Sequence, residues 1–133
     1  MRLYFWQIIT EQNWETDLFF GNEQGEFINV EMNPDTGDIV LRIRTKTIEP
    51  LRDIYQLDEY GNISELLEVR EYDPRIRPWY QAAKKQRQPT WSPIYSAFSG
   101  YNTSLDIAAV QPIFDSDNNL IGVLANEIRL TQM

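Results

Sequence analysis

Apolar and polar residues alternate in several short stretches of the chain, and this pattern predicts β-strands with one buried face. Turns that carry Gly or Asn separate neighbouring stretches, which is typical of antiparallel hairpins. The predicted strands cover residues 17–20, 26–30, 39–45, 54–57, 66–69, 90–97, 104–114 and 120–130. In the third of these, apolar residues alternate with Arg42 and Arg44. We expect that basic face to lie in solvent.

Two helices are predicted beside the strands. Residues 3–12 fit a short helix, and a second helix runs from Pro78 to Arg87. Proline suits the first position of a helix, and it pushes the preceding Arg77 out of the helical conformation. The pattern therefore predicts an α+β fold, an antiparallel sheet of about five strands with helices packed on one face.

The composition excludes most kinds of catalytic and metal site. The 133 residues include no histidine and no cysteine. Ser–His–Asp and Cys–His nucleophilic sites cannot be built from this chain, and the commonest zinc ligands are missing. The acidic loop 115–119 lacks the EF-hand pattern and is predicted to be a hairpin turn. We therefore predict no catalytic residue, no metal site and no cofactor.

One enzymatic alternative remains, a carboxylate-dependent glycosidase. Such an enzyme needs two carboxyl groups that face each other across a cleft, at about 5 to 9.5 Å depending on mechanism. Asp106 and Glu127 are the pair to test.

Length and charge fit one domain, residues 1–133, with a small-molecule partner. Four Trp, seven Tyr and six Phe supply a core and the material for an aromatic-lined pocket. The net charge of -8 repels phosphate backbones, so nucleic acid is not an expected partner. Residues 1–9 look like the end of an amphipathic helix. We therefore expect the chain to be a fragment of a longer protein.

The segment YDPRIRPWY at residues 72–80 resembles the extracytoplasmic Cache sensor family. The likeness is to the membrane-distal lobe of double Cache domains, in bacterial signalling receptors with cyclase or histidine-kinase outputs. Further similar segments lie at residues 19–27, 90–95, 107–115 and 120–128. The resemblance implies a PAS-like fold, a periplasmic location and a membrane anchor elsewhere in the parent receptor. It also allows a homodimer.

A subset of this family binds free amino acids through a pattern of Tyr, then Arg-x-Trp-Tyr, then a later Tyr, and an Asp on the final strand. The matching residues here are Tyr72, Arg77, Trp79, Tyr80 and Tyr95, with Glu127 in place of the Asp. The resemblance therefore implies that these six residues bind a small polar ligand such as an amino acid or an amine.

The chemistry of these residue types agrees with that implication. Arg77 presents a planar fork of donors to a carboxylate. The Trp79 indole donates one hydrogen bond while its ring forms a wall. The Tyr95 hydroxyl and the Glu127 carboxylate accept from an ammonium group. An acid that ends an apolar strand face, as Glu127 does, is costly to bury without a positive partner.

The main competing hypothesis is a structural or dimerisation module with a degenerate pocket, in which Glu127 neutralises Arg77. Trp79 and Tyr80 then serve as core aromatics, and Tyr95 clusters with Trp91 on its strand. Separately from this hypothesis, Asp106 is expected to lie in solvent, with a position pointing into the pocket as the alternative. The volume of the pocket and the partner of Arg77 distinguish the two hypotheses.

Overall fold

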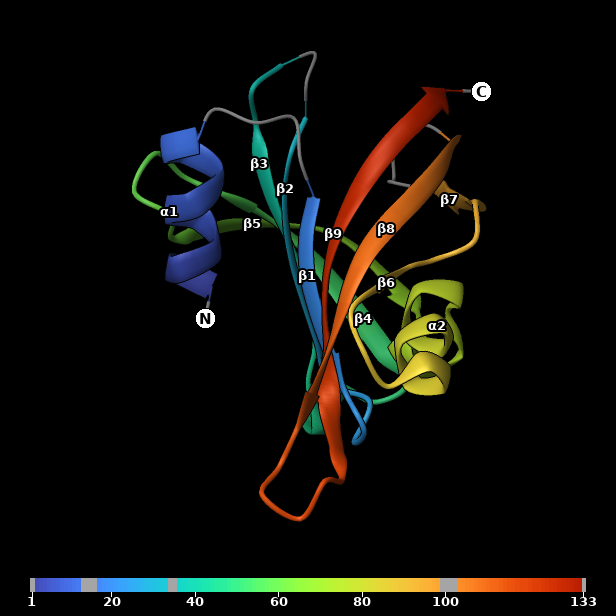
Figure 1. Ribbon diagram of the computed structural model, residues 1–133. Coiled ribbons are helices and arrows are strands. Elements are labelled where there is room, and N and C mark those ends of the chain that lie inside the picture. The colour runs from blue at the N-terminus through green and yellow to red at the C-terminus, as the bar shows by residue number, and fades with distance from the viewer. Residues whose placement is uncertain (1, 13–16, 34–35, 99–102, 133) are drawn as a thin grey trace.

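The computed structural model describes residues 2–12, 17–33, 36–98 and 103–132, and it shows one large sheet with a helix on each side (Figure 1). The helices are α1 (Arg2–Gln12) and α2 (Pro78–Gln86). The strands are β1 (Asp17–Asn22), β2 (Phe27–Met32), β3 (Ile39–Arg44), β4 (Leu51–Leu57), β5 (Ile63–Glu71), β6 (Thr90–Trp91), β7 (Tyr95–Phe98), β8 (Thr103–Phe114) and β9 (Leu120–Gln132). Short 3-10 helices occupy Lys46–Ile48 and Pro74–Ile76.

The strands follow the order β5-β4-β3-β2-β1-β9-β8-β6, and β7 pairs with β8. Each pairing between described strands is antiparallel. The predicted strands 17–20 and 26–30 pair as the hairpin β1–β2, the predicted strands 54–57 and 66–69 fall in the hairpin β4–β5, and the predicted turn at 115–119 joins the hairpin β8–β9. In the first of them, Gly25 takes a positive φ of 85°, which a residue without a Cβ adopts at no steric cost.

The prediction of about five strands is wrong, because the described residues form a sheet of nine. The sequence-distant strands β1 and β9 pair with each other, with Asp17 opposite Glu127, and this joins all the hairpins into one sheet. Local alternation carries no signal for such a pairing. The strand predicted at 90–97 is divided into β6 and β7, with Pro93 in the break. Proline cannot donate to a strand ladder.

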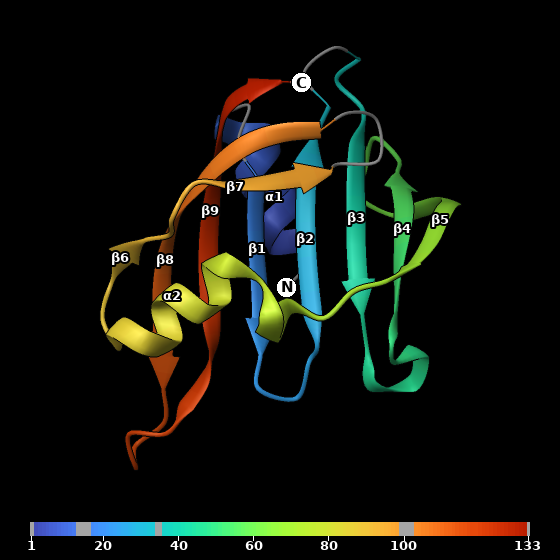
Figure 2. The ribbon, with the colours of Figure 1, turned by 90° about the vertical axis from the view of Figure 1, so that its right-hand side faces the viewer.

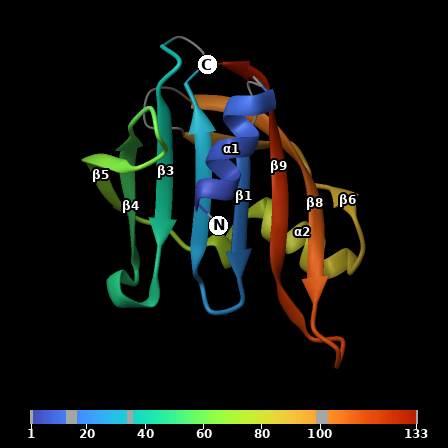
Figure 3. The ribbon, with the colours of Figure 1, turned by 90° about the vertical axis from the view of Figure 1, so that its left-hand side faces the viewer.

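Helices cover both faces of the sheet, and the expectation of a single covered face is therefore also wrong (Figures 2 and 3). Phe5 and Trp6 of α1 pack against apolar side chains of the first face, among them Val30 and Leu41. Neither α-helix in the described residues is long and apolar enough to cross a membrane.

The second face changes in character along its length. Near α2 the face carries apolar side chains, the buried residues Phe19, Phe27, Tyr95, Ala108, Val110, Val123 and Ala125, and Trp79, Tyr80 and Ala83 of α2 pack against them. Farther along the same strands, inward positions carry charges. In Figure 2, β7 and the beginning of β8 lie across this face above α2, and Figure 1 places them on the α2 side. A polar compartment is thereby enclosed beside an aromatic core.

The helix α2 is defined at both ends by the residues that predicted it. Arg77, held extended by the following proline, precedes Pro78 at the first helical position. At the other end, Arg87 adopts a left-handed conformation and its N–H donates to the carbonyl of Ala83. The N-terminus of α2, and with it Arg77, is thus fixed at the mouth of the polar compartment.

Candidate ligand-binding site

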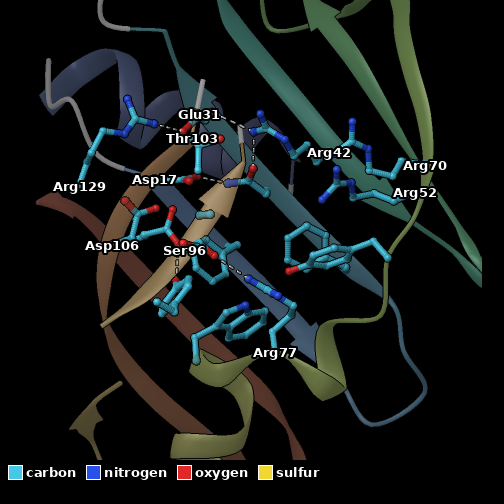
Figure 4. A pocket seen from close by; sticks show the side chains of 18 residues that line it. Asp17, Glu31, Arg42, Arg52, Arg70, Arg77, Ser96, Thr103, Asp106 and Arg129 are labelled. Atoms are coloured by element: carbon cyan, nitrogen blue, oxygen red, sulfur yellow. Dashed lines mark hydrogen bonds and ion pairs between the residues drawn. The ribbon is translucent and has the colours of Figure 1, made fainter. Parts of the chain in front are cut away.

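A cavity of about 320 Å³ lies between the sheet, the start of α2 and strand β7 (Figure 4). Its lining comes from eight of the strands, β1 to β5 and β7 to β9, and from the segment that leads into α2. Small-molecule sites in proteins have volumes of this order and combine apolar walls with a few placed polar groups.

Aromatic rings form the floor of the cavity. Trp79 is almost fully buried, and Phe19 meets it edge to face with ring centroids 4.6 Å apart. The Tyr72 ring packs on Phe27 at 4.8 Å, and burial raises the pKa of its hydroxyl to about 12. The buried Arg44 donates a hydrogen bond to the backbone carbonyl of Tyr72 at 2.6 Å, and this bond holds the backbone from which the Tyr72 ring projects.

Arg77 enters the cavity from the N-terminus of α2. Its Nη2 donates to the Ser96 carbonyl of β7 at 3.2 Å, and its guanidinium carbon lies 5.8 Å from the centre of the Tyr95 ring. In the part of the chain that the structure describes, Arg77 forms no ion pair. A guanidinium held by one carbonyl keeps donors for a bidentate anion.

Carboxyl groups gather on the opposite wall. Glu127 accepts a hydrogen bond from the Tyr95 hydroxyl, and the carboxyls of Asp17 and Asp106 lie beside it. Burial, followed by the negative charge of Asp106, raises the pKa of Glu127 to about 7. Burial also raises the pKa of Asp17, and the charges of Glu31 and Glu127 add to that effect. The Oδ1 atom of Asp106 is buried without a hydrogen-bond partner among the described residues.

Arginines from β3, β4 and β5 form the remaining wall. Arg42 binds Glu31 at 3.0 Å and Asn29 at 2.8 Å, and Arg129 reaches the same glutamate at 3.2 Å. In Figure 4, the arginines of this wall lie across the cavity from Asp106 and Asp17, with Arg77 below. Carboxyl groups therefore gather on one side of the cavity, with Arg129 near them, and the other arginines lie on the opposite side and below.

The structure brings five of the six predicted ligand-binding residues onto this one cavity. They are Tyr72, Arg77, Trp79, Tyr95 and Glu127. The sixth, Tyr80, is fully buried behind Trp79, and its hydroxyl donates to Glu23 at 2.6 Å outside the cavity lining. Its place in the structure is the packing position that the competing interpretation assigns to it.

Two expectations about charged residues are wrong. Arg42 and Arg44 were expected in solvent, yet each is about 95% buried, because that face of β3 is the wall of the cavity and its flank. Asp106 was expected to be solvated and is only 1% exposed. The alternation of apolar and polar residues predicts which side chains share a strand face. Whether that face is buried depends on contacts with segments that are distant in sequence.

Two alternative interpretations also lose support. Arg77 and Glu127 do not form the ion pair that closes a degenerate pocket, since Arg77 bonds to Ser96 and Glu127 to Tyr95. Trp91 is 56% exposed, so it does not form an aromatic cluster with the buried Tyr95.

The enzymatic alternative lacks the required geometry. The carboxyls of Asp106 and Glu127 interact directly, whereas a glycosidase needs them separated across a substrate cleft. No group of three or more acidic residues within the described ranges is arranged to hold a metal ion.

Residues 19–133 match the family model described as the first PDC sensor domain of proteins like methyl-accepting chemotaxis proteins. The chain belongs to this PDC sensor family. The match covers most of the chain, including every strand of the sheet except the start of β1. The family accounts for the PAS-like arrangement and makes this PDC domain a sensor for signal transduction. Such domains of chemoreceptors are typically extracytoplasmic and are generally not enzymes. A comparison with curated proteins gives no match.

Residues that the sequence did not single out complete the cavity of this PDC domain. They include Asp17, Asn29, Glu31, Arg42, Arg52 and Arg70. The sequence contained a signal for these residues. Each is a polar residue on a strand, and a residue two positions away, on the same face, is apolar or also lines the cavity. Recognising it required the strand order.

Proposed function

We propose that this PDC domain is the extracytoplasmic sensor of a membrane receptor and that its cavity binds a small zwitterion, an amino acid or a related amine. The observation that supports this most directly is the separation of charge inside one cavity. Arg77 stands on one side and forms no ion pair with a described carboxylate, whereas Asp106 stands on the other side (Figure 4), with Glu127 beside it. An amino acid carries the two complementary charges on one small molecule.

In this proposal the ligand carboxylate binds the guanidinium of Arg77 above the face of Trp79. The ammonium group points toward Glu127, with Asp106 and the Tyr95 hydroxyl as further acceptors. A bound cation would stabilise the ionised forms of Glu127 and Asp106, because two negative charges at close range repel each other strongly in a cavity of low dielectric constant. Glu127 provides the countercharge that an Asp provides in the pattern the chain resembles.

Binding would act on the receptor by stabilising one arrangement of the domain over another. The ligand bridges α2 and β7 to the acids of β8 and β9, so it favours the arrangement in which these elements are closest. A double Cache architecture and a cyclase, kinase or chemotaxis output belong to the parent receptor and are part of the proposal.

A thermal-shift screen of amino acids and amines tests the proposed function. At a concentration 100 times its Kd, a ligand adds about 2.7 kcal/mol to the free energy of unfolding. For a domain of this size, roughly 1 kcal/mol moves the unfolding midpoint by several degrees. We expect at least one α-amino acid to raise the midpoint by 5 °C or more, an order-of-magnitude figure that follows from these values. A folded protein that no zwitterion stabilises would favour the degenerate-pocket hypothesis.

A further inference from the structure

The cavity contains a second arginine that forms no ion pair with a carboxylate of the described residues, Arg52 of β4. The residue is only 6% exposed. Its Nε has no hydrogen-bond partner within the described residues, and its guanidinium carbon lies 4.5 Å from the centre of the Tyr72 ring. Burying a guanidinium against an aromatic face recovers only part of the hydration that the charge loses.

The surroundings of Arg52 make its charge more costly still. Arg70 of β5 lies directly opposite it in the strand pairing, and like charges in that position destabilise a sheet. Burial, and then the positive charge of Arg42, lowers the pKa of Arg52 to about 10. An uncompensated buried charge is strongly destabilising, and an anionic group of a ligand would remove this cost.

The other cavity arginines of the basic wall already have acidic partners. Arg42 pairs with Glu31, and Arg70 pairs with Glu68 at 2.6 Å. Arg77 and Arg52 are left as the two guanidinium groups that line the cavity and form no ion pair with a described carboxylate. One ligand carboxylate satisfies Arg77 in the proposed function, and a second anionic group is needed for Arg52.

The positions of the two arginines suit one small molecule. Tyr72 is near both, because its ring lies 4.5 Å from the guanidinium carbon of Arg52 and the charges of both guanidinium groups act on its hydroxyl. In Figure 4, Arg52 and Arg77 both reach into the same space, and the acidic wall lies opposite. A ligand there meets one acidic region and two separate cationic groups.

We propose that Arg52 is a specificity-determining residue that binds a second anionic group, so that the ligand is a dicarboxylic amino acid. This inference rests on the proposed function and narrows its ligand class. The ammonium faces Glu127, the α-carboxylate faces Arg77, and the side-chain carboxylate faces Arg52. A neutral amide at the last position leaves the guanidinium without a charged partner.

Calorimetric titration with four probes tests the assignment: L-aspartate, L-glutamate, L-asparagine and L-glutamine. We expect at least one dicarboxylic amino acid to bind about tenfold or more tightly than its own amide, the size of one charge-assisted contact. In Arg52→Gln, this preference should shrink to less than about threefold through weaker binding of the acid, with the amide little changed. Lys46→Gln is the control, because Lys46 is exposed between β3 and β4 and does not line the cavity, so this variant should retain the preference.

Arg52→Lys provides a second test in case Arg52→Gln does not fold. Lysine keeps the positive charge, so this variant should retain part of the preference. Equal affinities for an acid and its amide in the unmodified protein would overturn the assignment, as would a preference that survives Arg52→Gln. In both cases the proposed function stands. If none of the four probes binds and the wider amino-acid screen is also negative, the proposed function fails together with the assignment.

Discussion

Replacing Arg77 with glutamine should remove amino-acid binding and leave the fold intact. Loss of one partner of a desolvated charge-assisted contact costs about 2 to 5 kcal/mol, or about 30-fold to several thousand-fold in affinity. The fold should tolerate the change because, among the described residues, the guanidinium donates one hydrogen bond, to the Ser96 carbonyl, and forms no ion pair. Calorimetric titration and thermal unfolding measure the two effects on the same sample.

Lys85→Gln is a control on the same helix, since Lys85 is exposed near the other end of α2 and does not line the cavity. It removes the same charge and should leave affinity unchanged. An Arg77→Gln protein that unfolds, or that binds every ligand as before, would show that Arg77 has a structural role or faces no ligand.

Replacing Glu127 with glutamine should stabilise the empty domain above neutral pH and weaken ligand binding. The pKa of Glu127 is raised to about 7 from an ordinary value of 4.5. Between these two pH values the unfolded chain loses the proton while the folded one retains it. The favourable contribution of the protonated group is therefore complete below pH 4.5 and lost as pH rises through 7. A pKa difference of one corresponds to about 1.4 kcal/mol, so the complete loss is about 3 kcal/mol.

The measurement is the free energy of unfolding by denaturant at several pH values, for the unmodified protein and Glu127→Gln. The advantage of the variant should grow by on the order of 2 kcal/mol between pH 5 and pH 8. Glu65→Gln, which removes an exposed carboxylate of β5, should show no such growth. At pH 8 the Glu127 variant should also bind a stabilising amino acid about tenfold or more weakly, because the ammonium loses its countercharge. A variant equally stable at both pH values and unchanged in binding would remove Glu127 from the site.

The sequence predicted local elements well because their signals are local. Pro78 determines the start of α2, and the hairpins follow from turn residues such as Gly25 between alternating strands. Arg77, Trp79 and Glu127 were found through a short motif and an acid on an apolar face, and the structure places all three on one cavity.

The remainder depended on contacts between distant segments. Arg52 belongs to a strand whose alternation is unremarkable, and only the arrangement of β4 beside β3 and β5 encloses it. Asp17 becomes part of the acidic wall because β1 pairs with β9 and places it opposite Glu127. Tyr80 was predicted from the motif but does not line the cavity. Consecutive residues of a helix point to different sides, so Tyr80 is buried in the core while Trp79 faces the cavity.

A crystal structure of the domain with the amino acid that stabilises it most tests the central claim directly. The account predicts ligand density in the cavity beside Trp79, with the α-carboxylate in hydrogen-bonding contact with Arg77 and the ammonium facing Glu127. Density for the ligand in the groove beside Pro89 and Trp91, or a carboxylate directed at the acidic wall, would contradict it.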